Sequence, residues 1–230
     1  MPSFRIKPGG TRRNGWEILN IAGVPFYVEP SFLLFIGIVM MLVVSWGMSL
    51  VQAALLCFVI FFSLLGHEGG HAMTARILGK TGVAVSLVAF GGRTYHGSAT
   101  NGQSLAITSA GPGATFALAA GAWALLKYGL PDGALQGGAG FVLHYVVVLN
   151  VFWLIINLVP IFPLDGGMIL FHGLVYKLGE ARALVATAYV SLIFCLLGGW
   201  LAFSSQHFII LMFAFMFFMQ NLEIVLASRR

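Results

Sequence analysis

The feature that most constrains this sequence is a series of long apolar runs that contain almost no charged side chains. A run of about 20 apolar residues is long enough to cross a bilayer as a helix. Only 8% of the 230 residues are charged, whereas an average soluble domain has about 25%. The sequence therefore predicts an all-α, polytopic membrane protein with about six transmembrane helices, at residues 31–50, 53–78, 104–128, 141–159, 183–203 and 208–227.

Three shorter segments lie before or between these spans. Residues 16–28 contain short β-like runs broken by glycine and proline, which predicts an N-terminal β-hairpin at the membrane interface. Residues 83–98 are rich in β-branched and small residues and are too short to span as a helix, which predicts a re-entrant β-loop. Residues 168–178 are apolar but only about 11 long, and this length favours a buried half-helix over a span.

The spans divide the chain into three parts and also predict its orientation. Residues 1–30 form a basic, interfacial segment without a cleavable signal sequence, residues 31–178 form the membrane core, and residues 183–230 form two further spans. With six spans, both termini share one side, and Lys127 is the single basic residue opposite. The basic residues on the side of the termini are Arg5, Lys7, Arg12, Arg13, Arg76, Lys80, Arg93, Lys177, Arg182, Arg229 and Arg230. Since basic residues concentrate on the cytoplasmic side, both termini are expected there, and the net charge of +5 reports topology and lipid contact, not nucleic-acid binding.

The end of the second span carries the sequence His67-Glu68-Gly69-Gly70-His71, an H-E-x-x-H motif. On a helix, positions i and i+4 share a face, so His67 and His71 can offer two imidazole nitrogens to one metal ion. Glu68 lies beside that face, where it can accept a proton from a water that the metal activates. Because two histidines and a carboxylate are costly inside a bilayer, the motif predicts a functional metal site near the cytoplasmic side.

Asp165 is the predicted third metal ligand. A catalytic zinc site has three protein ligands and an open position, and Asp165 directly follows the fourth span, whereas the other aspartate, Asp132, lies in an outer loop. Pro160 and Pro163 break the helix before Asp165 and let it face the metal. Asn157, two turns earlier, could hydrogen-bond a substrate carbonyl or a developing oxyanion.

Other interpretations of these residues remain open at the level of sequence. An H-E-x-x-H motif can arise by chance, Asp165 could only cap the following helix, and Asn157 could only join two helices. Asn150, seven residues before Asn157, could line the same cavity or contact a neighbouring helix. The remaining polar residues in apolar surroundings fit packing roles better than metal binding, and they are Cys57, Cys195, His96, His144, His172 and His207.

Three motifs together resemble those of the site-2 protease family, intramembrane zinc metalloproteases. They are H67-E-G-G-H71, G111-P-G-A-T115 and N157-L-V-P-I-F-P-L-D165-G-G, and the resemblance covers roughly residues 16–178. It implies one Zn²⁺ per chain, bound by His67, His71 and Asp165, with Glu68 as the catalytic base. Thr115 departs from the family pattern, which usually has asparagine there, and the regulatory PDZ or CBS domains of the family are expected to be absent.

The resemblance also implies the kind of substrate. The expected function is hydrolysis of a peptide bond in or near a transmembrane segment of another membrane protein, that is, regulated intramembrane proteolysis at the cell membrane. An unwound substrate segment would pair with the β-loop at Val85, Leu87 and Ala89, and the last two spans would form a lateral gate. A membrane partner would regulate cleavage, and no nucleic acid is involved. The alternatives are a membrane metal-ion transporter, which would need polar groups through the whole bilayer, and an inactive protease-like scaffold.

Overall fold

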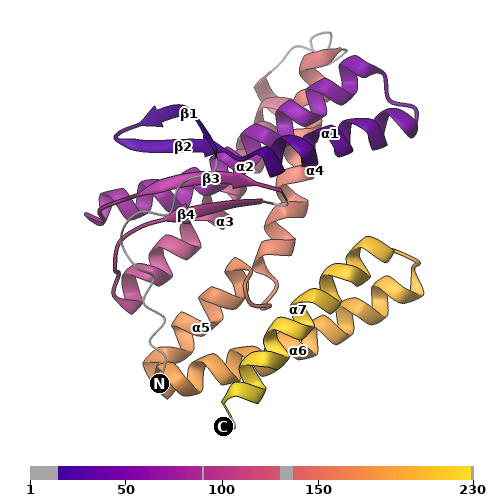
Figure 1. Ribbon diagram of the computed structural model, residues 1–230. Helices are drawn as coiled ribbons and strands as arrows, with labels where there is room; N and C mark the ends of the chain where they lie inside the picture. Colours follow the sequence, from indigo (N-terminus) through magenta and orange to yellow (C-terminus); the bar gives the residue numbers. More distant parts are fainter. Residues whose placement is uncertain (1–14, 90, 130–136, 229–230) are drawn as a thin grey trace.

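The computed structural model describes residues 15–89, 91–129 and 137–228. It consists of long helices with one small sheet (Figure 1). Predictions that concern residues 1–14, Asp132, Arg229 and Arg230 lie outside the described residues. The elements, in chain order, are β1 (Trp16–Ile21), β2 (Val24–Val28), α1 (Pro30–Ser45), α2 (Leu50–Ile77), β3 (Ala84–Val88), β4 (Gly91–Tyr95), α3 (Asn101–Ala124), the π-helical turn η1 (Leu125–Gly129), α4 (Gly138–Leu158), α5 (Asp165–Leu178), α6 (Glu180–Ser204) and α7 (Phe208–Ala227).

Five helices in the described part of the chain are long and apolar enough to cross a membrane: α2, α3 with η1, α4, α6 and α7. This confirms the predicted helical, multi-pass membrane architecture. The expected count of six is not confirmed, because α1 has only 16 residues. At 1.5 Å per residue it is about 24 Å long, less than the roughly 30 Å of a bilayer's hydrocarbon core. The predicted half-helix is α5, which begins at Asp165 and has 14 residues.

The two predicted β segments form one four-stranded sheet of order β1-β2-β3-β4. Strands β1 and β2 form the expected hairpin, β3 and β4 form a second one, and β2 and β3 join the hairpins in parallel. The segment predicted as a separate re-entrant loop is therefore half of a larger sheet. The predicted entry of residues 83–98 into the membrane is not confirmed.

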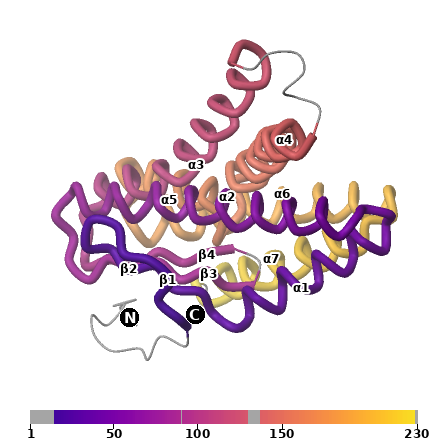
Figure 2. Tube along the Cα trace, turned by 90° about the horizontal axis from the view of Figure 1, so that it is seen from above, coloured from indigo at the N-terminus to yellow at the C-terminus, as the bar shows by residue number. Residues whose placement is uncertain are grey.

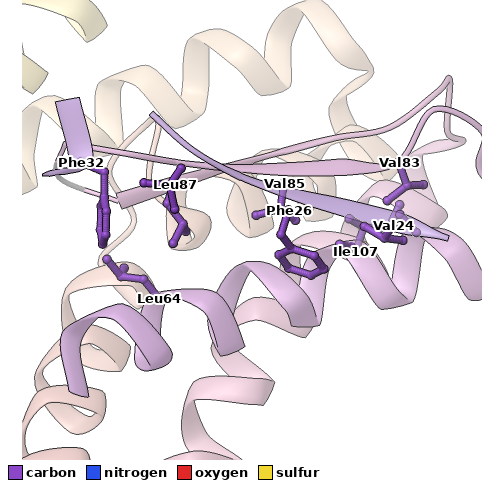
Figure 3. Packing of buried hydrophobic residues seen from close by; sticks show 11 residues of the cluster. Val24, Phe26, Phe32, Leu64, Val83, Val85, Leu87 and Ile107 are labelled. Atoms are coloured by element: carbon purple, nitrogen blue, oxygen red, sulfur yellow. The ribbon is translucent and has the colours of Figure 1, made fainter. Parts of the chain in front are cut away.

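A hydrophobic core lies between this sheet and the helices beneath it, as Figure 3 shows. Alternate residues of β2 point into it, among them Val24 and Phe26, and β3 adds Val85 and Leu87. Helix α2 contributes Leu64 from the opposite side. Because α2 carries the H-E-x-x-H motif just beyond Leu64, this packing fixes the motif relative to the sheet.

Helices α2 and α3 approach each other closely at the level of the motif. A Cβ on Gly70 would lie 2.5 Å from the Ala110 carbonyl oxygen, so only glycine permits this distance. Both helices start at a capping box, in which Ser49 and Gln52 serve α2, and Thr100 and Gln103 serve α3. The α2–α3 pair is thus a rigid support for the site.

Helices α6 and α7 form an antiparallel pair at the C-terminal end of the chain. Both views show the pair beside α5, and Figure 1 shows it set apart from α1. Helix α6 packs against α5 and α7. Most of the large side chains of the pair are exposed and apolar, including Trp200, Phe208 and Ile209, as expected for helices that contact lipid.

Candidate metal centre

The structure brings His67, His71 and Asp165 together at one point, as the sequence predicts. The two Nε2 atoms are 3.2 Å apart, and they lie 3.1 Å and 3.5 Å from the Oδ2 atom of Asp165. Both histidines are buried, and Asp165 is largely buried. Among the described residues, this is the only group of three such side chains close enough to share a metal ion.

The hydrogen bonds on the far side of each imidazole determine its tautomer. His71 Nδ1 lies 2.7 Å from the Ile107 carbonyl oxygen, which only accepts, so this nitrogen carries the proton. His67 Nδ1 lies 2.8 Å from Thr115 Oγ1, and that hydroxyl donates to the Gly111 carbonyl at 3.1 Å. The hydroxyl therefore accepts from His67. In the neutral rings, both Nε2 atoms present lone pairs to each other and to Asp165.

This donor set fits a zinc ion. Ligand atoms about 2.0–2.1 Å from zinc in a tetrahedron lie about 3.3 Å from one another, close to the three separations observed here. Asp165 Oδ2 is buried and shares no hydrogen bond with the described residues. Three converging acceptors with no proton between them repel one another unless a cation lies among them. His67, His71 and Asp165 are therefore suited to hold zinc, and they leave a fourth position open.

Asp165 reaches this point because the chain breaks and turns between α4 and α5. Helix α5 begins at Asp165, and its N-cap is Leu164, so the Asp165 carboxylate does not cap the helix. A Cβ on Gly166 would lie 2.3 Å from the Leu158 carbonyl oxygen, and one on Gly167 would lie 2.5 Å from the Ile161 carbonyl carbon. The two glycines thus let the first turn of α5 pack directly on the broken segment.

Glu68 lies next to the metal ligands and is held by the sheet. Thr94 of β4 donates a hydrogen bond to its Oε2 atom at 2.7 Å. The second carboxylate oxygen, Oε1, makes no hydrogen bond to any described residue. A Cβ on Gly92 would lie 2.2 Å from Glu68 Cγ, so glycine at this position makes room for the side chain. Glu68 is buried, yet it keeps one oxygen available to a reacting molecule.

The structure decides between the two interpretations of Asn150, whereas the substrate role of Asn157 stays a prediction. Asn150 donates to Ser63 Oγ of α2 at 2.8 Å, so it contacts a neighbouring helix. Asn157 is half-buried, and its side chain makes no hydrogen bond to the part of the chain that the structure describes.

The expected exposed edge at β3 is wrong. Val85 and Leu87 are completely buried, and β3 is paired with β2 on one side and with β4 on the other. Ala89 lies beyond the end of β3, where its N–H donates to Ser31 Oγ at 3.3 Å. Sequence alone missed this because β2 and β3 are joined across two intervening helices. The outer strand next to Glu68 is β4.

Reasoning from sequence also missed three residues that support the centre: Thr115, Ile107 and Thr94. In the sequence, Thr115 differs from the family pattern, and nothing local indicates that it contacts His67. It lies four residues after Gly111 on α3, and this spacing lets its hydroxyl donate to the Gly111 carbonyl. The Ile107 contact uses a main-chain carbonyl, which leaves no signature in the sequence.

The fold and the centre together indicate a helical, multi-pass membrane protein with a candidate metal site. Residues 132–198, which include Asp165 and the broken helix, match the family model Peptidase family M50. The structure is similar to that of the site-2 protease from Methanocaldococcus jannaschii, with a TM-score of 0.63, 21% identity, and coverage of 92% of this chain and 95% of that chain. These matches agree with the resemblance to the site-2 proteases that the motifs of the chain predicted.

The chain is also similar to curated zinc metalloproteases and related proteins. The chain is 29% identical over 171 residues to a zinc metalloprotease of Methanocaldococcus jannaschii, covering 73% of this chain and 48% of that protein. It is 32% identical over 154 residues to stage IV sporulation protein FB of Bacillus subtilis, covering 65% and 50%. The chain spans about half the length of the curated relatives that it matches.

Proposed function

We propose that this chain is an intramembrane zinc endopeptidase, which hydrolyses a peptide bond in or near a transmembrane segment of another membrane protein. The observation that carries the proposal is the convergence of His67, His71 and Asp165, with both Nε2 lone pairs free, beside the half-free carboxylate of Glu68. The match of residues 132–198 to Peptidase family M50 supports the same chemistry.

Glu68 carries out the proton transfers of this reaction. His67, His71 and Asp165 would hold the zinc ion, which would supply Lewis acidity toward a carbonyl oxygen and water. Glu68 Oε1 accepts a proton from the attacking water as the new C–O bond forms. The carboxyl group then gives this proton to the leaving nitrogen as the C–N bond breaks, so Glu68 returns to its ionised form. Thr94 holds the other carboxylate oxygen and keeps the base oriented.

The change Glu68→Gln tests this role. It should lower cleavage of a single-span membrane protein by about a hundredfold or more, the usual contribution of a general base, while zinc stays bound. Glu180→Gln is a matched control, because Glu180 is exposed at the start of α6. Wild-type cleavage by the Glu68→Gln variant would exclude Glu68 as the base, and a wild-type chain without zinc or cleavage would refute the function.

For substrate binding, we propose strand addition to β4 instead of β3. Strand β4 is one of the two edge strands of the sheet, and its Gly92 and Thr94 lie against Glu68. An unwound substrate segment paired with β4 would satisfy its backbone groups next to the base. The free amide of Asn157 would then be available to a substrate carbonyl, and the α6–α7 pair would admit the substrate from the bilayer.

Cysteine cross-linking tests the strand assignment. In a Glu68→Gln background, which retains the substrate, Arg93→Cys on β4 should form a disulfide with a cysteine near the cleavage point of the substrate. Ile18→Cys is the control, since Ile18 is exposed on β1 at the opposite edge of the sheet. Cross-linking through position 18 and not through position 93 would contradict the proposal.

A further inference from the structure

Two polar side chains of the C-terminal helices hold the segment that precedes Asp165. Ser191 lies on α6 and Asn221 on α7, and both are completely buried. Ser191 Oγ accepts a hydrogen bond from the Phe162 N–H at 2.9 Å, and Asn221 Nδ2 donates to the Phe162 carbonyl oxygen at 2.8 Å. Both backbone polar groups of Phe162 are thus bonded by α6 and α7, which follow it in the chain.

Both side chains also bond a main-chain carbonyl of their own helix. Asn221 Nδ2 also donates to the Phe217 carbonyl at 2.8 Å, and Ser191 Oγ lies 2.9 Å from the Thr187 carbonyl oxygen, nearer than the Pro160 carbonyl oxygen at 3.3 Å. Each side chain is therefore fixed in one orientation by its helix. A non-helical peptide at membrane depth must find partners within the protein, and here the α6–α7 pair supplies them.

The position of Phe162 is transmitted to Asp165 through close packing. Residues 158–164 lie directly on the first turn of α5, where neither Gly166 nor Gly167 has room for a methyl group. The Leu164 N–H also bonds the Ile161 carbonyl at 2.7 Å, which makes the segment a tight turn. The segment cannot shift without moving the start of α5, and Asp165 is the first residue of that helix.

We propose that Ser191 and Asn221 are positioning residues for the metal ligand Asp165, so that the α6–α7 pair is a structural part of the metal centre. This inference rests on the proposed function, because it takes Asp165 as a zinc ligand. In the described structure, α6 packs extensively only against α5 and α7. A displacement of the pair would therefore release Phe162 and loosen the zinc site while leaving α2 and α3 in place.

The test uses the full chain in detergent, with Ser191→Ala and Asn221→Leu as variants. Zinc affinity is measured by competition with a chelator, and backbone hydrogen exchange of residues 160–165 is measured without zinc. We expect zinc affinity to fall about tenfold, as for other outer partners of metal ligands, and exchange in the segment to accelerate. The matched controls are Ser204→Ala and Gln220→Leu, which alter exposed side chains of the same helices and should change neither quantity.

The outcomes separate this inference from the proposed function. If the wild type binds zinc and cleaves substrate but neither variant loses zinc affinity, the inference is wrong and the function stands. Faster exchange with unchanged zinc affinity also overturns it, because the bonds would then hold the loop without positioning the ligand. A wild-type chain that binds no zinc overturns both. If Asn221→Leu does not fold, Ser191→Ala decides the question alone.

Discussion

The two histidines of the metal centre differ in what holds their Nδ1 atoms. His71 bonds a main-chain carbonyl, that of Ile107, which no side-chain substitution removes. His67 bonds the hydroxyl of Thr115, which can be deleted. The orientation and basicity of a metal-binding imidazole depend on such an outer partner. A single substitution at Thr115 can therefore weaken the binding of zinc by His67 while His67 itself is unchanged.

Replacement of Thr115 by valine should weaken zinc binding. Valine keeps the shape of threonine but leaves the His67 N–H buried without an acceptor, so zinc affinity should fall by about tenfold to a hundredfold. Thr115→Ser keeps the hydroxyl and should retain most of the affinity. Chelator competition on the purified proteins measures both values. Equal losses in the serine and valine variants would mean that packing, and not the hydrogen bond, is what Thr115 contributes.

Gly111 gives a second prediction at the level of a single residue. A Cβ at this position would lie 2.1 Å from His71 Nε2, whereas one on Gly113 would meet nothing within 4 Å. Gly111→Ala should therefore displace the imidazole and reduce bound zinc at least about tenfold, while Gly113→Ala on the same helix should not. Metal analysis of the two purified variants decides this. Full zinc in the Gly111→Ala protein would show that His71 is not confined as the structure implies.

At this scale the sequence predicted which side chains converge better than it predicted the groups that hold them. His67, Glu68 and His71 follow from one local spacing, and Asp165 follows from the prolines and glycines around it. Thr115, Ile107 and Thr94 act across elements, so their roles depend on how helices and strands pack. Local patterns carry little information about that packing.

At the scale of elements, α5 is joined to α3 by a reciprocal pair of hydrogen bonds. His172 Nδ1 donates to Asn101 Oδ1 at 2.6 Å, and Asn101 Nδ2 donates to the His172 carbonyl at 2.8 Å. Burial lowers the pKa of His172 from its ordinary value of 6.5, although the nearby carboxylate of Glu180 opposes this effect. The neutral imidazole is thus the form that the folded helix pair favours.

This pKa shift predicts a pH dependence of stability. Because the unfolded chain binds a proton at His172 more readily than the folded chain does, stability should fall as pH drops below about 6.5. Above that pH both states are neutral, and the effect disappears. Thermal unfolding of the wild type and of His172→Gln between about pH 8 and pH 5 measures it, and the wild type should lose more stability on acidification. Parallel curves for the two proteins would contradict the assignment.

The sheet shows why some elements could not be predicted from sequence. Each hairpin is visible locally, since β1 with β2, and β3 with β4, are close in the chain. The parallel pairing of Phe26 with Val85 joins residues separated by α1 and α2. Only this pairing places β3 inside the sheet and leaves β4 beside Glu68. The sequence does not reveal the pairing of β2 with β3. For this reason it predicts the substrate-binding edge at β3, although the neighbouring strand β4 lies at the edge of the sheet.

At the scale of the whole molecule, two lysines lie near opposite ends of the long helix α3 with η1. Lys80 donates to Gln103 Oε1 near the start of α3, at 2.6 Å. Lys127 lies near the other end, with its ammonium group 5.0 Å from the ring centre of Trp123 and 5.3 Å from that of Tyr128. Lys127 follows Gln103 by 24 positions (127 − 103), which correspond to about 36 Å of helix, enough to cross a bilayer. Aromatic residues with a lysine are typical of a membrane interface.

This separation predicts which ends of the spans face the cytoplasm. The prediction needs a test because α1 is too short to count as a span. If basic residues mark the cytoplasmic side, Lys127→Cys should react with a membrane-impermeant maleimide in intact cells, and Arg182→Cys should react only after permeabilisation. The parent chain is the control, because Cys57 and Cys195 are buried. His71 lies six residues before the end of α2, about 9 Å along the helix. Labelling of position 127 in intact cells, and of position 182 only after permeabilisation, would therefore place the metal centre near the cytoplasmic surface, where water reaches it. Labelling of position 182 alone in intact cells would invert the topology and put the centre on the opposite side.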